Sequence, residues 1–220
     1  MSDSSGNWFS KFKKVSQLEP KPNPGVVPKQ TIETRKWNNK GVSLYNRGRH
    51  EEAIDCYDKA LELDPRYVDA WYNKGVSLHN QARHEEAIDC YDRALQLDPR
   101  LAMAWNNKGS SLDSLGRYED AIRCYDKALE LDPCHVMAWN NKGNSLRSLG
   151  RFEEAIRCLD RALELDPHDA FAWYNKALAE DELSYLRDAA LSYQQFLMLA
   201  PAQNAEQIEY AHKRLRELGG

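Results

Sequence analysis

Four cysteines recur at a fixed spacing, and a set of this kind invites a metal-binding or disulfide interpretation. Cys56, Cys90, Cys124 and Cys158 lie 34 residues apart. Equivalent residues of stacked structural units are separated by about two helix layers of ~8–10 Å each, whereas a disulfide needs Cα atoms within roughly 7 Å. A single zinc ion cannot span such a row either. Together with Cys134, these residues are predicted to be reduced thiols in a reducing compartment, with no metal or other cofactor bound.

No combination of residues in the sequence predicts catalysis. His84 is followed by Glu85 and Glu86, but no second His stands four residues after His84, so a metalloprotease motif is absent. The sequence has no glycine-rich phosphate loop after a strand and no recognisable nucleophile–base pair. We therefore predict that the chain is not an enzyme, because activity depends on a site and not on a fold.

The overall charge and hydropathy exclude other classes of function. The 220 residues include 30 basic and 34 acidic side chains, and the net charge is −4. This near balance argues against a nucleic-acid binder and against a polybasic membrane clamp. No run of 18 apolar residues predicts a transmembrane helix, and the first residues do not resemble a secretory signal. The predicted location is the cytoplasm.

A 34-residue period runs through most of the chain. Tryptophan marks it five times, at Trp37, Trp71, Trp105, Trp139 and Trp173, and Gly, Ala and Pro residues keep the same spacing. This order of residues is typical of a helix–turn–helix solenoid, and the sequence resembles the tetratricopeptide repeat family. The resemblance implies an all-α, right-handed superhelix. The expected repeats cover residues 34–67, 68–101, 102–135, 136–169 and a divergent 170–203.

Each repeat can be numbered 1–34, with Trp at position 4. Positions 4, 8 and 11 then share one face of a first helix, and in repeat 3 these are Trp105, Gly109 and Leu112. An apolar stripe in the second half of the repeat predicts a second, amphipathic helix. Glycines between the two helices are expected to adopt a left-handed conformation, and they are Gly48, Gly116 and Gly150.

The two ends of the chain differ from the repeats. Residues 204–220 predict a capping helix with Ile208, Ala211, Leu215 and Leu218 on one side. Residues 1–33 are predicted to be a flexible tail with a proline-rich linker. Within the tail, Trp8, Phe9 and Phe12 are either a short amphipathic segment that docks on a membrane surface or a partner, or part of a disordered leader.

The resemblance implies that the first helices line the inner, concave wall of the superhelix. Position 6 is Asn in every repeat, namely Asn39, Asn73, Asn107, Asn141 and Asn175. A side-chain amide offers both a donor and an acceptor, which match the N–H and C=O of an extended peptide backbone. In this respect the chain resembles the superhelical repeats of the O-linked sugar transferase. The alternative is that these amides link neighbouring repeats to one another.

The rest of the inner wall varies from repeat to repeat, as expected of a surface that contacts a particular partner. Aromatic, methionine and amide side chains suit an adaptable peptide groove, although the methionines alternatively fill gaps between helices. The further predicted peptide-binding residues are Tyr45, Tyr72, His79, Met103, Asn106, Met137, Asn140, Asn144, Phe171 and Tyr174. Position 5 carries no Lys or Arg, so the carboxylate clamp of chaperone-binding family members is absent.

Position 7 is Lys in every repeat and borders the predicted packing face. Its aliphatic stem can cover apolar surface while its ammonium group reaches a carboxylate. The predicted partners are the acids at position 25, which are Asp58, Asp92, Asp126 and Asp160.

The predicted function is a non-catalytic scaffold that binds a peptide segment of a protein partner in its concave groove, through the Asn row and aromatic anchors. One alternative is self-assembly, in which the tail of one molecule docks into the groove of another. The other is a regulatory subunit of a separate enzyme.

Overall fold

The computed structural model describes residues 29–218, and this part of the chain contains eleven α-helices and no strands. The helices are α1 (Lys29–Tyr45), α2 (His50–Leu63), α3 (Val68–Asn80), α4 (His84–Leu97), α5 (Ala102–Ser114), α6 (Tyr118–Leu131), α7 (Val136–Ser148), α8 (Phe152–Leu165), α9 (Ala170–Glu182), α10 (Leu186–Leu199) and α11 (Ala205–Leu218). The amphipathic segment predicted around Trp8 lies outside the described residues.

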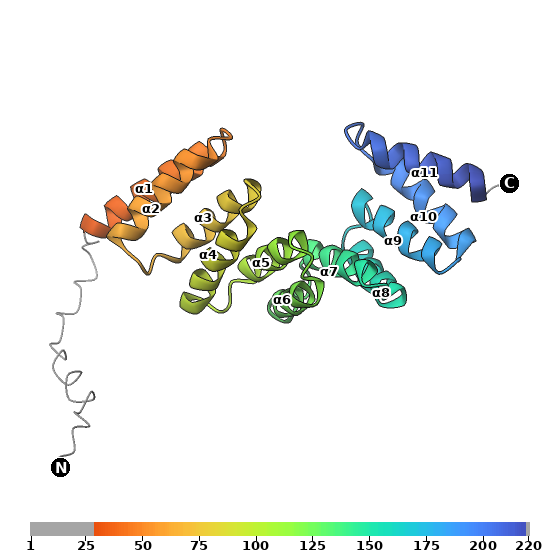
Figure 1. Ribbon diagram of the computed structural model, residues 1–220, viewed down its shortest axis with the longest axis horizontal. Coiled ribbons are helices and arrows are strands. Elements are labelled where there is room, and N and C mark those ends of the chain that lie inside the picture. The colour runs from red at the N-terminus through yellow and green to blue at the C-terminus, as the bar shows by residue number, and fades with distance from the viewer. Residues whose placement is uncertain (1–28, 219–220) are drawn as a thin grey trace, which may run out of the picture.

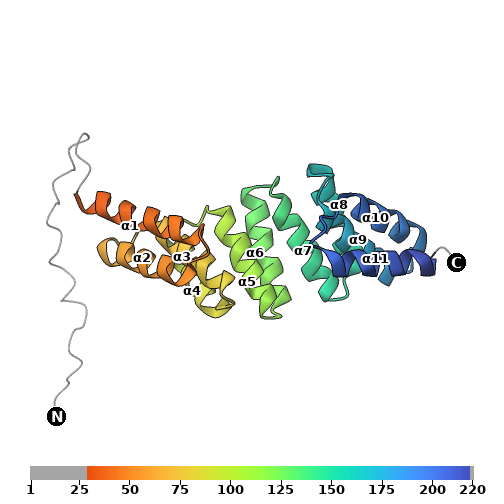
Figure 2. The same ribbon diagram turned by 90° about the horizontal axis from the view of Figure 1, so that it is seen from above.

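The helices stack as five pairs followed by a single helix, and the stack curves into an arc (Figure 1). The odd-numbered helices lie on the inner side of the arc and the even-numbered helices on the outer side, most plainly from α3 to α8. Figure 2 shows α1 and α11 at opposite ends of the molecule. The described residues therefore form the predicted all-α helical-repeat superhelix.

The glycine at position 8 lets the two helices of a repeat approach closely. A Cβ atom built on Gly109 would lie 2.6 Å from Cε1 of Tyr125, and the same contact at Gly41 with Tyr57 would be 2.4 Å. The Tyr125 ring is fully buried. A side chain at position 8 would occupy space that this ring already fills, which explains why a poor helix former stands in mid-helix.

The tryptophan at position 4 connects each repeat to the turn that precedes it. The indole Nε1 donates to the carbonyl oxygen of the proline six residues earlier, at 3.0 Å in each of four repeats: Trp71 to Pro65, Trp105 to Pro99, Trp139 to Pro133 and Trp173 to Pro167. The ring itself packs against buried side chains of neighbouring repeats. The tryptophan therefore stabilises both the turn before its repeat and the packing between repeats.

The turn between the two helices of a repeat uses the predicted left-handed residue. Gly48, Gly116 and Gly150 have φ angles of +74°, +72° and +73°. Repeats 2 and 5 place Ala82 and Ser184 at the same position, with φ angles of +59° and +60°. Because a Cβ atom disfavours this conformation, these two turns are strained relative to the other three.

The structure corrects one predicted boundary, since α1 begins at Lys29 and residues 29–33 belong to this helix and not to the tail. No Asp-Pro turn separates α1 from an earlier repeat, so the helix runs back to the residue after Pro28. At the other end, α11 is the helix expected after Pro201. Ala211 is buried against α10, with Ile208 and Leu215 beside it.

Candidate peptide-binding groove

The inner wall of the arc is formed by α1, α3, α5, α7 and α9, and the position-6 asparagines form its central row. In four of them the amide nitrogen donates to the position-5 residue of the preceding repeat. These bonds are Asn73 Nδ2 to Asn38 Oδ1 at 3.1 Å, Asn107 Nδ2 to Tyr72 Oη at 3.1 Å, Asn141 Nδ2 to Asn106 Oδ1 at 3.2 Å and Asn175 Nδ2 to Asn140 Oδ1 at 3.0 Å. The amide nitrogens therefore link neighbouring repeats, as the alternative interpretation expected.

The asparagine oxygens have a different environment from the nitrogens. Asn73, Asn141 and Asn175 are half-buried, and no group within residues 29–218 donates a hydrogen bond to their Oδ1 atoms. Asn39 belongs to the first repeat, is exposed and has no described repeat before it. The row therefore still presents acceptors along the inner wall.

An exposed apolar row runs beside the asparagines at position 2 of the last three repeats. Met103 on α5, Met137 on α7 and Phe171 on α9 are 55 %, 61 % and 50 % exposed. The methionines therefore do not fill gaps between helices, because side chains in that role would be buried. These three apolar residues stand at the same repeat position on successive inner helices and so lie along the same side of the wall.

Other predicted site residues make hydrogen bonds within the protein, which leaves less of each side chain available to a ligand. Asn106 is buried; its amide donates to Asn107 Oδ1 at 3.1 Å, and its oxygen accepts from Asn141. Tyr72 accepts from Asn107, and burial raises the pKa of its hydroxyl. Tyr45 Oη accepts from Asn80 Nδ2 at 2.7 Å. Tyr45 and Tyr72 keep part of their rings accessible, whereas Asn106 does not offer its side chain to a ligand.

The remaining predicted residues also have partners. His79 Nδ1 lies 2.9 Å from Ser111 Oγ, and burial lowers the pKa of the His79 ring. Asn140 donates to an Asp169 carboxylate at 3.3 Å. Asn144 accepts from the Arg147 guanidinium at 3.0 Å, and Tyr174 packs its ring on Phe196 at 4.8 Å between centroids. Each of these residues is half-buried and borders the inner wall.

One polar cluster of the inner wall centres on Asp113, which is not among the predicted peptide-binding residues. Asp113 accepts from Tyr125 Oη and from Ser145 Oγ, each at 2.7 Å. Burial raises the pKa of the Asp113 carboxyl, although both hydrogen bonds oppose that shift. A serine stands at position 10 of repeats 1 to 4 and is the sequence signal for this cluster. In the structure, Ser111 and Ser145 each contact the position-12 residue of the preceding repeat.

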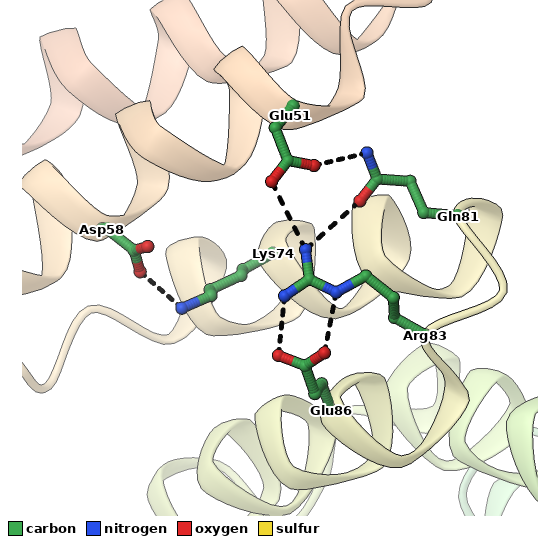
Figure 3. Close-up of polar contacts among 6 residues, drawn as sticks. All are labelled: Glu51, Asp58, Lys74, Gln81, Arg83 and Glu86. Atoms are coloured by element: carbon green, nitrogen blue, oxygen red, sulfur yellow. Dashed lines mark hydrogen bonds and ion pairs between the residues drawn. The ribbon is translucent and has the colours of Figure 1, made fainter.

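The position-7 lysines bind the predicted position-25 acids, which confirms that expectation. The Nζ–Oδ1 distances are 2.5 Å for Lys74–Asp58, 2.5 Å for Lys108–Asp92, 2.6 Å for Lys142–Asp126 and 2.5 Å for Lys176–Asp160. Figure 3 shows the first of these pairs beside Arg83, which lies between Glu51 of repeat 1 and Glu86 of its own repeat. These pairs connect neighbouring repeats away from the inner wall.

The cysteines are free thiols, and the four at position 23 are buried while Cys134 is exposed. Burial raises the pKa of Cys90 and Cys124 to about 11, so the reactive thiolate is disfavoured. Between residues 29 and 218, no three His, Cys, Asp or Glu side chains group closely enough to hold a metal ion. None of the described helices combines the length and hydrophobicity that a membrane span requires.

Comparisons with known proteins agree with this architecture. Tetratricopeptide repeat family models match residues 38–102, 102–133 and 136–169. No curated protein sequence matches the chain significantly.

Three solved structures illustrate the fold similarity. PilF of Pseudomonas aeruginosa shares 22% identity at a TM-score of 0.73, covering 86% of this chain and 90% of PilF. MamA of Desulfovibrio magneticus RS-1, residues 41 to the end, shares 20% identity at a TM-score of 0.71, covering 78% and 97%. YrrB, described as a TPR protein with an unusual peptide-binding site, shares 25% identity at a TM-score of 0.66, covering 80% and 90%. With five helix pairs in a 34-residue register and family models matched across its centre, the chain belongs to the tetratricopeptide repeat family.

Proposed function

We propose that this chain is a non-catalytic scaffold that binds an extended segment of a protein partner along its inner wall. The observation that supports this proposal is the exposed row of Met103, Met137 and Phe171 on consecutive inner helices. A soluble surface rarely exposes apolar side chains in register unless they contact a partner. The five free thiols fit a reducing compartment such as the cytoplasm.

Two kinds of contact would hold the segment. The apolar row would bind its side chains, because methionine and aromatic groups adapt to varied apolar partners. The free Oδ1 atoms of Asn73, Asn141 and Asn175 would accept hydrogen bonds from its backbone N–H groups. Contacts of the apolar row depend on the side chains of the bound segment and would give specificity. Contacts of the asparagine oxygens depend only on an extended backbone and would add affinity for any sequence. YrrB, a relative of similar fold, has a peptide-binding site according to its description.

The test is selection of binders from a displayed random-peptide library on the full chain, followed by fluorescence anisotropy with the selected peptides. Replacing Met103 and Met137 with Asp should weaken binding about tenfold or more. The same charge placed on the outer surface by Arg123→Asp and Arg157→Asp is the matched control and should leave binding unchanged. Peptides that bind both variants as tightly as the wild type would refute the proposal.

The asparagine row requires a separate comparison, because most of its members also hold the repeats together. Asn39→Ala removes no bond between repeats, whereas Asn141→Ala removes the bond to Asn106. If the oxygens bind the peptide, Asn39→Ala weakens the affinity of a peptide that reaches repeat 1 and leaves thermal stability unchanged. If the row only links repeats, Asn39→Ala changes neither quantity and Asn141→Ala lowers stability by about 1 kcal/mol.

A further inference from the structure

The outer surface of the last repeat differs from that of the other four. Positions 19, 22, 26 and 29 of the second helix form one stripe, because they are three or four residues apart. Repeats 1 to 4 carry three or four charged residues there: Glu52, Asp55, Lys59 and Glu62; Glu86, Asp89 and Arg93; Asp120, Arg123, Lys127 and Glu130; Glu154, Arg157, Arg161 and Glu164. Repeat 5 carries Asp188, Leu191, Gln195 and Met198.

The apolar residues of this stripe are exposed. Leu191 is 55 % and Met198 69 % exposed, and Tyr185 lies half-exposed at the start of α10. Stacking of a further repeat would not cover them. Arg123 and Glu130 occupy the same two positions in repeat 3, which has a repeat after it, and both are exposed. The apolar stripe on α10 therefore has no structural role within the array.

A cleft of about 750 Å³ lies beside the stripe, between α8 and α10 with α9 as its floor. Ile156, Trp173, Tyr185 and Leu191 supply its apolar lining, and Asp160, Glu180, Asp188 and Lys176 its charges. We call this the repeat-5 cleft. Asp160 is paired with Lys176 at 2.5 Å, and burial raises the pKa of the Glu180 carboxyl. Asp188 is therefore the exposed carboxylate that attracts a cationic ligand with apolar side chains.

The unpaired carboxylate of this cleft results from an exchange at position 16. Arginine stands there in the other four repeats and pairs with the acid at position 19, as in Arg117–Asp120 at 2.7 Å and Arg151–Glu154 at 2.7 Å. In repeat 5 the residue is Tyr185, and Asp188 has no ion pair within residues 29–218. The exchange thus adds an exposed ring and leaves a carboxylate unpaired in the same place.

The equivalent outer clefts of other repeats have a different charge. In repeat 4, Asp126 pairs with Lys142 at 2.6 Å, and the remaining acid, Glu154, lies beside Arg157 and Arg161. In repeat 1 two acids face four basic groups, and in repeat 3 four face four. A basic ligand is therefore directed to the repeat-5 cleft and repelled from the clefts of repeats 1 and 4.

We propose that residues 8–15 of a second copy of this chain bind the repeat-5 cleft and the adjoining stripe of α10. This segment contains Trp8, Phe9 and Phe12 together with Lys11, Lys13 and Lys14, and no acidic residue. Its aromatic rings complement Trp173, Tyr185 and Leu191, and its lysines complement Asp188. It precedes α1, whereas the cleft lies at the other end of the molecule (Figure 2). The contact is therefore heterologous and joins molecules head to tail, on the surface opposite to the proposed peptide groove.

The experiment uses two variants of the full chain. The tail variant is Trp8→Ala/Phe9→Ala/Phe12→Ala and the cleft variant is Leu191→Glu/Met198→Glu. Analytical ultracentrifugation should show that the wild type forms concentration-dependent oligomers, which high salt weakens. Each variant alone should be monomeric. An equimolar mixture should form a 1:1 dimer and nothing larger, because each variant supplies one intact half of the contact.

A synthetic peptide with residues 5–17 should bind the tail variant, whose cleft is intact, and bind about tenfold or more weakly when Leu191→Glu/Met198→Glu is added. Arg123→Glu is the matched control. Together with Glu130 it places two glutamates on α6 at positions 22 and 29, the positions of Leu191 and Met198 on α10, and it should leave peptide affinity unchanged. The proposal is overturned if the wild type stays monomeric at all concentrations, as docking of the tail within one molecule would require. It is also overturned if the mixed variants do not associate, or if the cleft substitutions leave the affinity for the peptide unchanged.

Discussion

Replacing Trp105 with Ala removes a side chain that touches three repeats. Its ring packs against three buried clusters, which include Leu78 of repeat 2, Leu112 of repeat 3 and Ala138 of repeat 4. Its Nε1 donates to the Pro99 carbonyl at 3.0 Å. The substitution therefore opens the interface between repeats and leaves a turn carbonyl without its partner.

The expected loss follows from these contacts. A partly exposed indole that buries about 150 Å² contributes roughly 4 kcal/mol at ~25 cal/mol per Å². The hydrogen bond adds about 1 kcal/mol. Because the ring edge reaches the surface, water enters part of the space, and the net loss of unfolding free energy should be about 3–5 kcal/mol. Trp37 packs against a single buried cluster and has no preceding repeat among residues 29–218, so Trp37→Ala should cost about 1–2 kcal/mol.

Urea denaturation followed by far-UV circular dichroism measures both variants against the wild type. The free energies are comparable only if the dependence on urea concentration keeps its slope, because a repeat array can lose cooperativity. A loss below about 1 kcal/mol for Trp105→Ala would contradict the stacking scheme. Equal losses for Trp37→Ala and Trp105→Ala would show that the contacts between repeats contribute little.

Three further predictions concern stability. Lys108→Glu should cost about 1–2 kcal/mol by turning the 2.5 Å pair with Asp92 into a repulsion, and adding Asp92→Lys should restore most of it in the same denaturation assay. Ala82→Gly should raise the free energy of unfolding by about 1 kcal/mol by relieving a φ of +59°, whereas Gly116→Ala should lower it by a similar amount; no change in either would mean that the turns are not strained. Asp113 has a raised pKa because it is buried, so the native state binds its proton more tightly than the unfolded chain does. Its contribution to stability is therefore full below the ordinary carboxyl pKa and is lost as pH rises through the raised pKa. Asp113→Asn should remove this part of the pH dependence of thermal unfolding. If the variant kept the wild-type dependence of Tm on pH, the assignment of this contribution to Asp113 would be wrong.

Features that depend on contacts within one repeat could be predicted from the sequence. The close approach at Gly109, the left-handed turn at Gly116 and the amphipathic second helix all follow from periodicity and from the conformations open to glycine. The start of α1 could not be predicted in this way, because the boundary of the other first helices is an Asp-Pro turn that α1 lacks.

Features that depend on the offset between repeats were harder to predict. A helical wheel places Asn141 on the inner face, but only the stacking of α7 on α5 decides that its amide nitrogen points at Asn106. The Lys108–Asp92 pair was predictable because position 7 borders the packing face and its long stem tolerates small errors in offset. The exposed stripe on α10 was not predicted, although Leu191 and Met198 stand at positions that are charged or polar in the other repeats.

The asparagine bonds between repeats bear on how such an array can change its length. The donor is the same amide at every junction, and the acceptor is Asn38, Asn106 or Asn140 at three junctions and Tyr72 at one. A junction therefore tolerates either acceptor without a change in its neighbour. In-frame duplication or deletion of one unit would leave every junction bonded, so selection can act on the exposed residues of a new unit immediately. Repeats 1 and 2 are identical at 24 of 34 positions, which is the similarity that a recent duplication of this kind would produce.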